Sequence, residues 1–290
     1  MNKLTPILKL LNQSKLHLKY TRTSIFYLHQ NYSSSLKSNN QLVEKHLDLL
    51  KQYNFHKPSM ETMLGSNEIW NKISPTQLKK TIEVLQSYKF SVNDISDILK
   101  AAPDLCSIET NEIIATLEAW LTCQFITDKL IDMLCVQPVL LKIDKELIPE
   151  RIPTYLLIFN NNRNKLILFL KLCPEVMYEN FDDIIEKYNY IRHTMGLKPK
   201  ELLNSRVLCS DLNFIKTRHT FLDRSGQFQY KTKDIPEEQL QNPTLNSIFD
   251  TTDRMFAEKI AKMSVKEYET FSSYYAQELA EEDGESDLES

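Results

Sequence analysis

The chain has 290 residues, of which 42% are hydrophobic and only four are glycine. This composition supplies enough apolar side chains for a folded core, and the scarcity of glycine argues against a fold of strands and tight turns. No apolar run approaches the roughly 20 residues of a membrane-spanning helix. The formal net charge is −4, so any nucleic-acid binding must come from basic residues gathered on one face.

Residues 1–43 carry six basic side chains and no acid, and the first acid is Glu44. Leu4, Ile7 and Leu8 can share one helical face, and Ser and Thr are scattered through the segment. A basic, acid-free, amphipathic N-terminus is typical of a mitochondrial transit peptide, and the alternative is a disordered basic arm. We therefore expect the protein in the mitochondrial matrix.

A pattern of about 35 residues recurs along the following part of the chain. Ser91 and Asp94 predict a reciprocal N-terminal cap, and the apolar residues that follow at i, i+3, i+4 and i+7 predict a short helix. Pro103 should end this helix, because proline lacks the N–H that the helix needs. The leucine and proline that define the pattern recur as Leu99 and Pro103, Leu134 and Pro138, and Leu170 and Pro174.

Two weaker copies flank these three. PKELLNSRVLC, residues 199–209, keeps Leu202 but has Arg206 where the proline stood, and a fainter copy around Tyr53 and Leu64 precedes the array. A unit of two short helices cannot bury its own apolar face, so such units stack into a curved array with a concave side. We expect this array to span residues 44–226.

Residues 227–277 are expected to form a helical cap on the array, and residues 278–290 a disordered acidic tail. Residues 227–277 are rich in Phe and Tyr. Such aromatic clusters anchor protein partners when they are exposed, and they close the last unit of the array when they pack inward. The tail contains seven acids and no basic residue, which favours disorder. The residues considered for partner binding are Leu245, Ile248, Phe249, Phe256, Tyr268, Phe271, Tyr274 and Tyr275.

The sequence contains no pattern typical of a catalytic, cofactor or metal site. The six histidines are scattered without metal-binding spacing, and no glycine-rich phosphate loop occurs. The five cysteines form no CxxC pair and lie beside apolar helical faces, so buried thiols fit better than a disulfide framework. We therefore expect a protein that is not an enzyme and needs no cofactor.

The repeated LxxxPxL unit resembles the motif of the mitochondrial transcription termination factor (mTERF) family. The lines YKFSVNDISDILKAAPDLC, FITDKLIDMLCVQPVLL and LILFLKLCPEVM carry this resemblance. It implies an all-α superhelical solenoid in which each unit has two α-helices and a short 3₁₀ turn, with a basic concave face. Arg206 departs from the motif and puts the geometry of its turn in doubt.

The C-terminal lines IKTRHTFLDRSGQFQYK and NPTLNSIFDTTDRMFAEKIA are similar to a member of the family that binds mitochondrial ribosomal RNA. The resemblance implies a Sun-domain RNA cytosine-5 methyltransferase as a heterodimer partner, with a role in large mitoribosomal subunit assembly. The alternative within the family is a mitochondrial DNA-binding regulator of transcription. A third possibility, from another class, is a protein scaffold whose charges only solvate its surface.

Nucleic-acid binding would depend on basic residues in the second half of the chain. Arginine is suited to this because its planar guanidinium can hold two phosphate oxygens at once. Arg151 and Arg218 occupy the same repeat position, where the family resemblance implies a phosphate-facing arginine. The full set of expected contacts is Arg151, Arg163, Lys165, Arg192, Lys198, Arg206, Lys216, Arg218 and Arg224.

Overall fold

The computed structural model describes residues 41–65, 68–231 and 240–289, with side chains as far as residue 281. The expected transit peptide over 1–43 lies almost wholly outside these residues. Helices and turns make up the described part, which contains no strand, and this confirms the expected all-α class.

Three successive units follow the expected plan of two α-helices closed by a 3₁₀ helix. They are α4 (Pro75–Ser87), α5 (Val92–Ala101) and η2 (Pro103–Ser107); α6 (Thr110–Thr122), α7 (Thr127–Val136) and η3 (Pro138–Leu141); and α8 (Leu147–Ile158), α9 (Arg163–Leu172) and η4 (Pro174–Met177). A fainter unit precedes them, with helical residues 41–52, α3 (Lys57–Gly65) and η1 (Glu68–Asn71). Each proline of the pattern begins a 3₁₀ helix, as expected.

Local signals in the sequence account for the helix ends. Ser91 accepts the N–H of Asp94, and the Asp94 carboxylate accepts the N–H of Ser91, so the predicted capping box is present. Leu99 and its equivalents Leu134 and Leu170 are fully buried, because each faces the neighbouring unit. The spacing of the repeat therefore fixes both the ends and the buried face of these helices.

The turns between the paired helices use a left-handed residue at a fixed interval. Asn54, Lys89 and Gln124 lie 35 residues apart and have φ of 61°, 70° and 58°. The N–H that follows the first two bonds back to the carbonyls of Leu50 and Leu85, which ends the preceding helix. Glycine would fit these positions with less strain, so the chain builds its turns at a small local cost.

The fourth unit, which contains the weaker copy over 199–209, departs from the plan of the other units. Its first helix, α10 (Phe181–Asn189), continues as a π-helical turn, η5 (Tyr190–Thr194), and two 3₁₀ helices, η6 (Pro199–Asn204) and η7 (Val207–Cys209), replace the second α-helix. The N–H of Arg206 donates to the Asp250 carboxylate at 3.2 Å. A proline could not make that bond, which explains why this turn differs from the other three.

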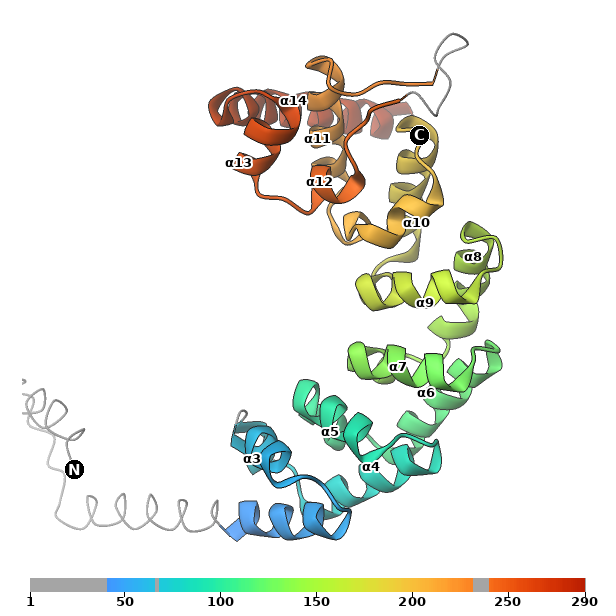
Figure 1. Ribbon diagram of the computed structural model, residues 1–290. Helices are drawn as coiled ribbons and strands as arrows, with labels where there is room; N and C mark the ends of the chain where they lie inside the picture. Colours follow the sequence, from blue (N-terminus) through green and yellow to red (C-terminus); the bar gives the residue numbers. More distant parts are fainter. Residues whose placement is uncertain (1–40, 66–67, 232–239, 290) are drawn as a thin grey trace, which may run out of the picture.

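The units stack into an arc (Figure 1). Helices α3, α5, α7 and α9 line its inner side, and α4, α6 and α8 lie on the outer side. Equivalent helices of neighbouring units contact one another from α3 to α9, and one buried core runs along the whole array. Figure 1 also shows that α11 (Leu212–Arg224) continues the stack at the C-terminal end.

A helical cap closes this end of the array. It consists of α12 (Leu245–Phe249), α13 (Asp253–Met255), the π-helical η9 (Phe256–Ala261) and α14 (Val265–Glu289), which packs on α11. A disordered tail was expected over 278–290, whereas the structure continues α14 as far as Glu289. Leu279 is buried and Glu278 pairs with Arg224, so the start of the acidic stretch is anchored to the fold.

Candidate nucleic-acid interface and C-terminal cap

One polar contact recurs inside the units and positions their turns. A side chain of the first helix donates to a carbonyl of the 3₁₀ turn: Trp120 Nε1 to Leu140 O at 3.1 Å, and Tyr155 OH to Val176 O at 2.7 Å. In the fourth unit, Lys187 Nζ takes this role toward Leu208 O at 3.4 Å. These bonds satisfy buried carbonyls that no helix partner reaches.

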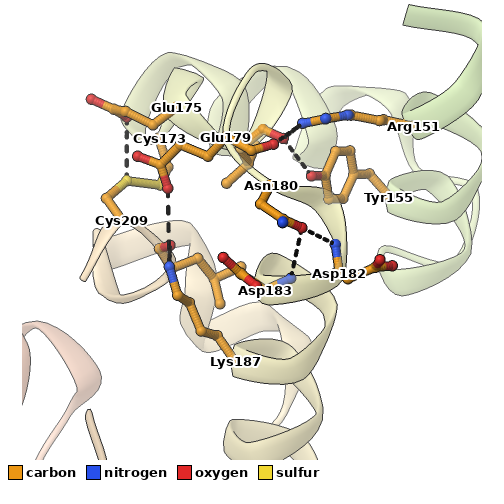
Figure 2. A network of polar contacts seen from close by, with 12 residues as sticks. Arg151, Tyr155, Cys173, Glu175, Glu179, Asn180, Asp182, Asp183, Lys187 and Cys209 are labelled. Atoms are coloured by element: carbon orange, nitrogen blue, oxygen red, sulfur yellow. Dashed lines mark hydrogen bonds and ion pairs between the residues drawn. A yellow bond between two sulfur atoms is a disulfide. The ribbon is translucent and has the colours of Figure 1, made fainter. Parts of the chain in front are cut away.

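Arg151 lies inside this framework (Figure 2). Its side chain is buried, and Nη1 donates to Val176 O at 2.9 Å and to Glu179 O at 2.7 Å. The guanidinium also lies 5.2 Å from the ring centroid of Phe181. The expectation that Arg151 faces nucleic-acid phosphates is therefore wrong for this structure, because its donors already hold the turn of its own unit.

Arg218 is likewise buried and bound to main-chain carbonyls, at the junction between the array and the cap. It is 1% exposed and donates to Ile248 O, to Thr251 O at 2.9 Å and to Asp253 Oδ1 at 2.7 Å. The rings of Phe214 and Phe256 lie on either side of its guanidinium, at 4.5 and 4.6 Å. This corrects the second expected phosphate contact, since Arg218 joins α11 to α12 and α13 instead.

Two further expected arginines are exposed but already paired. Arg206 donates to Leu172 O at 2.9 Å and to Glu175 at 2.7 Å, and so joins the fourth unit to the third. Arg224 forms two hydrogen bonds with Glu278, which raise the pKa of the arginine and lower that of the glutamate. In this structure neither guanidinium is free for phosphate.

The inner side of the arc is largely charge-balanced over the described residues. Lys100 pairs with Asp97 on α5, and Lys171 of α9 pairs with Asp132 of α7. Lys142, at the end of η3, pairs with Asp104 of the preceding unit at 2.7 Å. The uniformly basic concave face that the family resemblance implies is therefore not found there.

The remaining expected contacts are reachable from solvent. Arg163 and Lys165 stand half-buried in the first turn of α9, and Arg163 Nε donates to Cys123 O of the preceding unit at 3.1 Å. Arg192 and Lys198 are exposed on either side of Gly196, and Lys216 is half-buried on α11. Arg163 and Lys165 thus lie on α9, Arg192 on η5, Lys198 just before η6 and Lys216 on α11.

An open groove lies between α9 and η6. It has a volume of about 470 Å³ and contains the 54% exposed side chain of Leu168. Lys200, an exposed residue outside the full set of expected contacts, stands on its rim. The residues that line the groove are Leu168, Lys171, Leu172, Lys200, Leu203 and Asn204.

The expected partner-binding residues are mostly inside the cap. Those now buried are Leu245, Ile248, Phe249, Phe256, Tyr268 and Tyr275, whereas Phe271 is half-buried. Phe256, Tyr268 and Phe271 pack on Phe221 of α11 and so close the last unit. The burial of this set corrects its assignment as partner anchors. Tyr274 alone of this set is exposed, at 66%, and the 54% exposed Met255 joins it as an apolar side chain that helical spacing had not revealed.

A buried histidine connects the polar segment after α11 to the array. His219 Nδ1 lies 2.8 Å from the Tyr190 hydroxyl, and Nε2 lies 3.0 Å from the Tyr230 hydroxyl. Burial lowers the pKa of His219 to about 4, which outweighs the opposite effect of Asp223. The ring is therefore neutral near pH 7 and acts as a structural link.

Among the described residues, one cluster has the side chains of a metal site. The ligand atoms of Cys173, Glu175 and Cys209 lie within 4.8 Å of one another. The structure joins Cys173 and Cys209 by a disulfide bond, which corrects the expectation that all five cysteines are thiols.

No described helix is both long enough and apolar enough to span a membrane.

Comparison with known proteins agrees with this architecture. The mTERF family model matches residues 7–257. Transcription termination factor 4, mitochondrial, of Mus musculus is 30% identical over 109 residues, which are 38% of this chain. The match spans about a third of that relative, or 31% of its length. With its proline-closed units and a family match over most of its length, the chain belongs to the mTERF family, whose members are nucleic-acid-binding mitochondrial proteins.

Proposed function

We propose that this protein binds mitochondrial ribosomal RNA and positions a separate Sun-domain RNA cytosine-5 methyltransferase during assembly of the large mitoribosomal subunit. The observation that carries the RNA part is the groove between α9 and η6, with the exposed Lys200 in its lining. The partner part rests on the C-terminal lines that resemble an rRNA-binding member of the family. Neither part calls for a catalytic group in this chain.

Charge pairing narrows the RNA-binding set. A lysine or arginine that is already neutralised by a carboxylate adds little attraction for phosphate, because its partner repels the same anion. The best remaining contacts are Arg163, Lys165, Arg192, Lys200 and Lys216, whose side chains have no carboxylate partner among the described residues. Contacts of this kind read the phosphate backbone and the shape of an RNA helix, not its bases.

The outer surface of the cap suits a protein partner better than RNA. Tyr274 and Met255 are exposed apolar side chains, and the sequence from Glu278 onward is strongly acidic. The acids repel RNA, whereas an RNA-modifying enzyme must carry a basic surface for its own substrate. Aromatic and methionine anchors beside an acidic stretch are therefore suited to such an enzyme.

A DNA-binding regulator of transcription is the second proposal. The relative from Mus musculus carries the name of a transcription termination factor, which favours this role. The same exposed cations would then contact DNA phosphates. Competition between duplex DNA and structured ribosomal RNA for the full-length protein distinguishes the two, since the first proposal expects RNA to be preferred.

The RNA test uses two matched variants of the full-length protein. In the first, Arg163, Lys165, Arg192, Lys200 and Lys216 are changed to Gln. The control carries five exposed lysines that have no carboxylate partner among the described residues, Lys45, Lys72, Lys80, Lys89 and Lys266, changed to Gln. The first variant should bind rRNA more weakly, and its log affinity should depend less steeply on log salt concentration. Both follow because a protein with fewer phosphate contacts releases fewer counterions when it binds. Equal effects of the two variants would contradict the proposed site, and salt-independent binding would contradict phosphate contacts altogether.

The partner test is affinity purification of the tagged protein from mitochondria, with bound proteins and RNA identified. The double variant Met255→Ser with Tyr274→Ser should lose the methyltransferase and keep ribosomal RNA. Leu157→Ser is the control, because Leu157 is 70% exposed on α8. This helix lies on the outer side of the arc and is not part of the cap (Figure 1). Recovery of mitochondrial DNA without a methyltransferase would favour the second proposal.

A further inference from the structure

The fourth unit is tied to the third by Cys173 and Cys209 (Figure 2). Cys173 precedes Pro174 at the end of α9 and is fully buried, whereas Cys209 ends η7 and is half-buried. The bond spans 36 residues, or about one repeat, with the two Cα atoms 6.5 Å apart. Stacking of adjacent units is therefore what brings the two sulfurs together.

The position before the proline is a contact point between units elsewhere in the array. Gln137, the equivalent of Cys173 in the preceding unit, donates from Nε2 to Lys171 O of the next unit at 2.6 Å. Cys209 is equivalent to Cys106, Leu141 and Met177, each of which is at most 1% exposed. At the seam between the third and fourth units, a covalent bond thus replaces a hydrogen bond, and one of its two cysteines, Cys209, is only half-buried.

We propose that Cys173 and Cys209 form a reversible redox tie that stiffens the seam between the third and fourth units. In the reduced protein, the Cys209 thiolate attacks glutathione disulfide and releases one glutathione thiolate, which takes up a proton. The Cys173 thiolate then attacks the Cys209 sulfur and displaces the second glutathione. Two thiols and one glutathione disulfide become one protein disulfide and two glutathione thiols, so atoms and electrons balance.

The environment of the pair supports a tie that can open without unfolding the seam. Arg206 binds Leu172 O and Glu175, so a non-covalent link between the two units remains when the disulfide is reduced. Glu175 Oε2 lies 3.2 Å from Cys209 Sγ, where it can accept a hydrogen bond from the reduced thiol. Reduction should therefore loosen this seam while the core on either side stays packed.

A metal site is the competing use of the same side chains. Reduced Cys173 and Cys209 with Glu175 could present three ligands, but Arg206 already neutralises the carboxylate at 2.7 Å. A bound cation would have to displace that arginine or share the carboxylate with it. The geometry thus favours exchange between thiols and a disulfide over metal binding.

The first experiment titrates the full-length protein with glutathione buffers of different redox ratio. Free thiols are trapped with an alkylating mass tag, and the linked peptides are identified by mass spectrometry. We expect the Cys173–Cys209 link to form and disappear reversibly, to be absent in Cys209→Ser and Cys173→Ala, and to persist in Cys135→Ser, a matched half-buried cysteine. No link at any ratio, or a link that a large excess of reduced glutathione cannot open, would overturn the proposal.

The second experiment asks whether the tie stiffens the seam. Hydrogen exchange of residues 202–210 should be slower in the oxidised protein, and the Tm should rise by roughly 5 °C or more, because a loop of this length is closed in the unfolded chain. In Cys209→Ser, oxidant should change neither quantity. Unchanged exchange in the wild type, or protection of the reduced thiols by added Zn²⁺, would overturn the redox tie, the latter in favour of a metal site.

Discussion

Arg218 of α11 and Asp253 of α13 form an ion pair at 2.7 Å in which the arginine is buried and the carboxylate is 64% exposed. This asymmetry shows what the arginine does. Its charge is taken up partly by one acid and partly by the carbonyls of Ile248 and Thr251, which belong to the cap. Arg218 thus links the array to the cap, at a position where the family resemblance had implied a phosphate contact.

Removing this arginine should weaken the fold and leave nucleic-acid affinity of the folded protein largely unchanged. Arg218→Ala strands several buried acceptors, so the free energy of unfolding should fall by about 3 kcal/mol or more in urea titration. Arg218→Lys should restore only part of it, because an ammonium cannot reproduce the planar fork. A stable Arg218→Ala protein with much weaker RNA binding would instead support the phosphate role.

The left-handed turns offer a stabilising change. Lys89→Gly and Gln124→Gly relieve backbone strain at φ of 70° and 58°, and each should raise the free energy of unfolding by about 0.5–1 kcal/mol. The two sites lie in different units, so their effects should add. Lys80→Gly, inside α4, is the control and should destabilise by about 1 kcal/mol. Destabilisation by Lys89→Gly would show that the lysine side chain matters more than the strain.

The exposed and buried tyrosines of α14 should behave differently. Tyr274→Ser should change the free energy of unfolding by less than about 0.5 kcal/mol, because its side chain is 66% exposed. Tyr268→Ala should cost about 3–5 kcal/mol, since it removes a ring packed on Phe221 and Phe256. Thermal unfolding of both variants checks this. Similar losses in both would mean that the two faces of α14 are misassigned.

His219 should make stability depend on mildly acidic pH. Its pKa is about 4 in the folded protein and about 6.5 when unfolded, so the unfolded chain binds more protons between these values. The contribution is complete above about pH 6.5 and is lost as the pH falls toward 4. Over that range it amounts to about 3 kcal/mol.

The measurement compares unfolding curves at several pH values for the wild type, His219→Gln and His193→Gln. The pH slope should flatten in His219→Gln and stay unchanged in His193→Gln, whose ring is exposed. Burial also lowers the pKa of His46, which adds a slope of the same sign to every variant and cancels in the comparison. An unchanged slope in His219→Gln would show that its ring is not held neutral by burial.

The repeat could be predicted because its signals are local. Caps such as Ser91 with Asp94, and stops such as Pro103, act within one turn of helix, so a single stretch of sequence reveals them. The role of Arg151 could not be predicted in this way. Periodicity indicates which way a side chain points, but the carbonyls that Arg151 binds lie 25 and 28 residues further on, in a turn whose position only the fold defines.

The Cys173–Cys209 bond lies between these cases. Its two cysteines stand one repeat apart, so the register itself indicated adjacent units, although the intracellular setting favoured thiols. The acidic C-terminus was expected to be disordered because like charges repel. That reasoning omitted Arg224, which meets the first of these acids, Glu278, and lies 5.4 Å from the ring centroid of Phe271.

Carbonyl acceptors recur throughout the junctions of this fold. Trp120, Gln137, Tyr155, Arg163 and Arg218 all donate to main-chain oxygens of a turn or a neighbouring unit. No amino-acid replacement can remove a main-chain oxygen. In each of these hydrogen bonds, therefore, only the donor can be lost by mutation, and the acceptor stays. Sequences of this architecture can therefore drift far apart, retaining a few donors and prolines, while the arc keeps its shape.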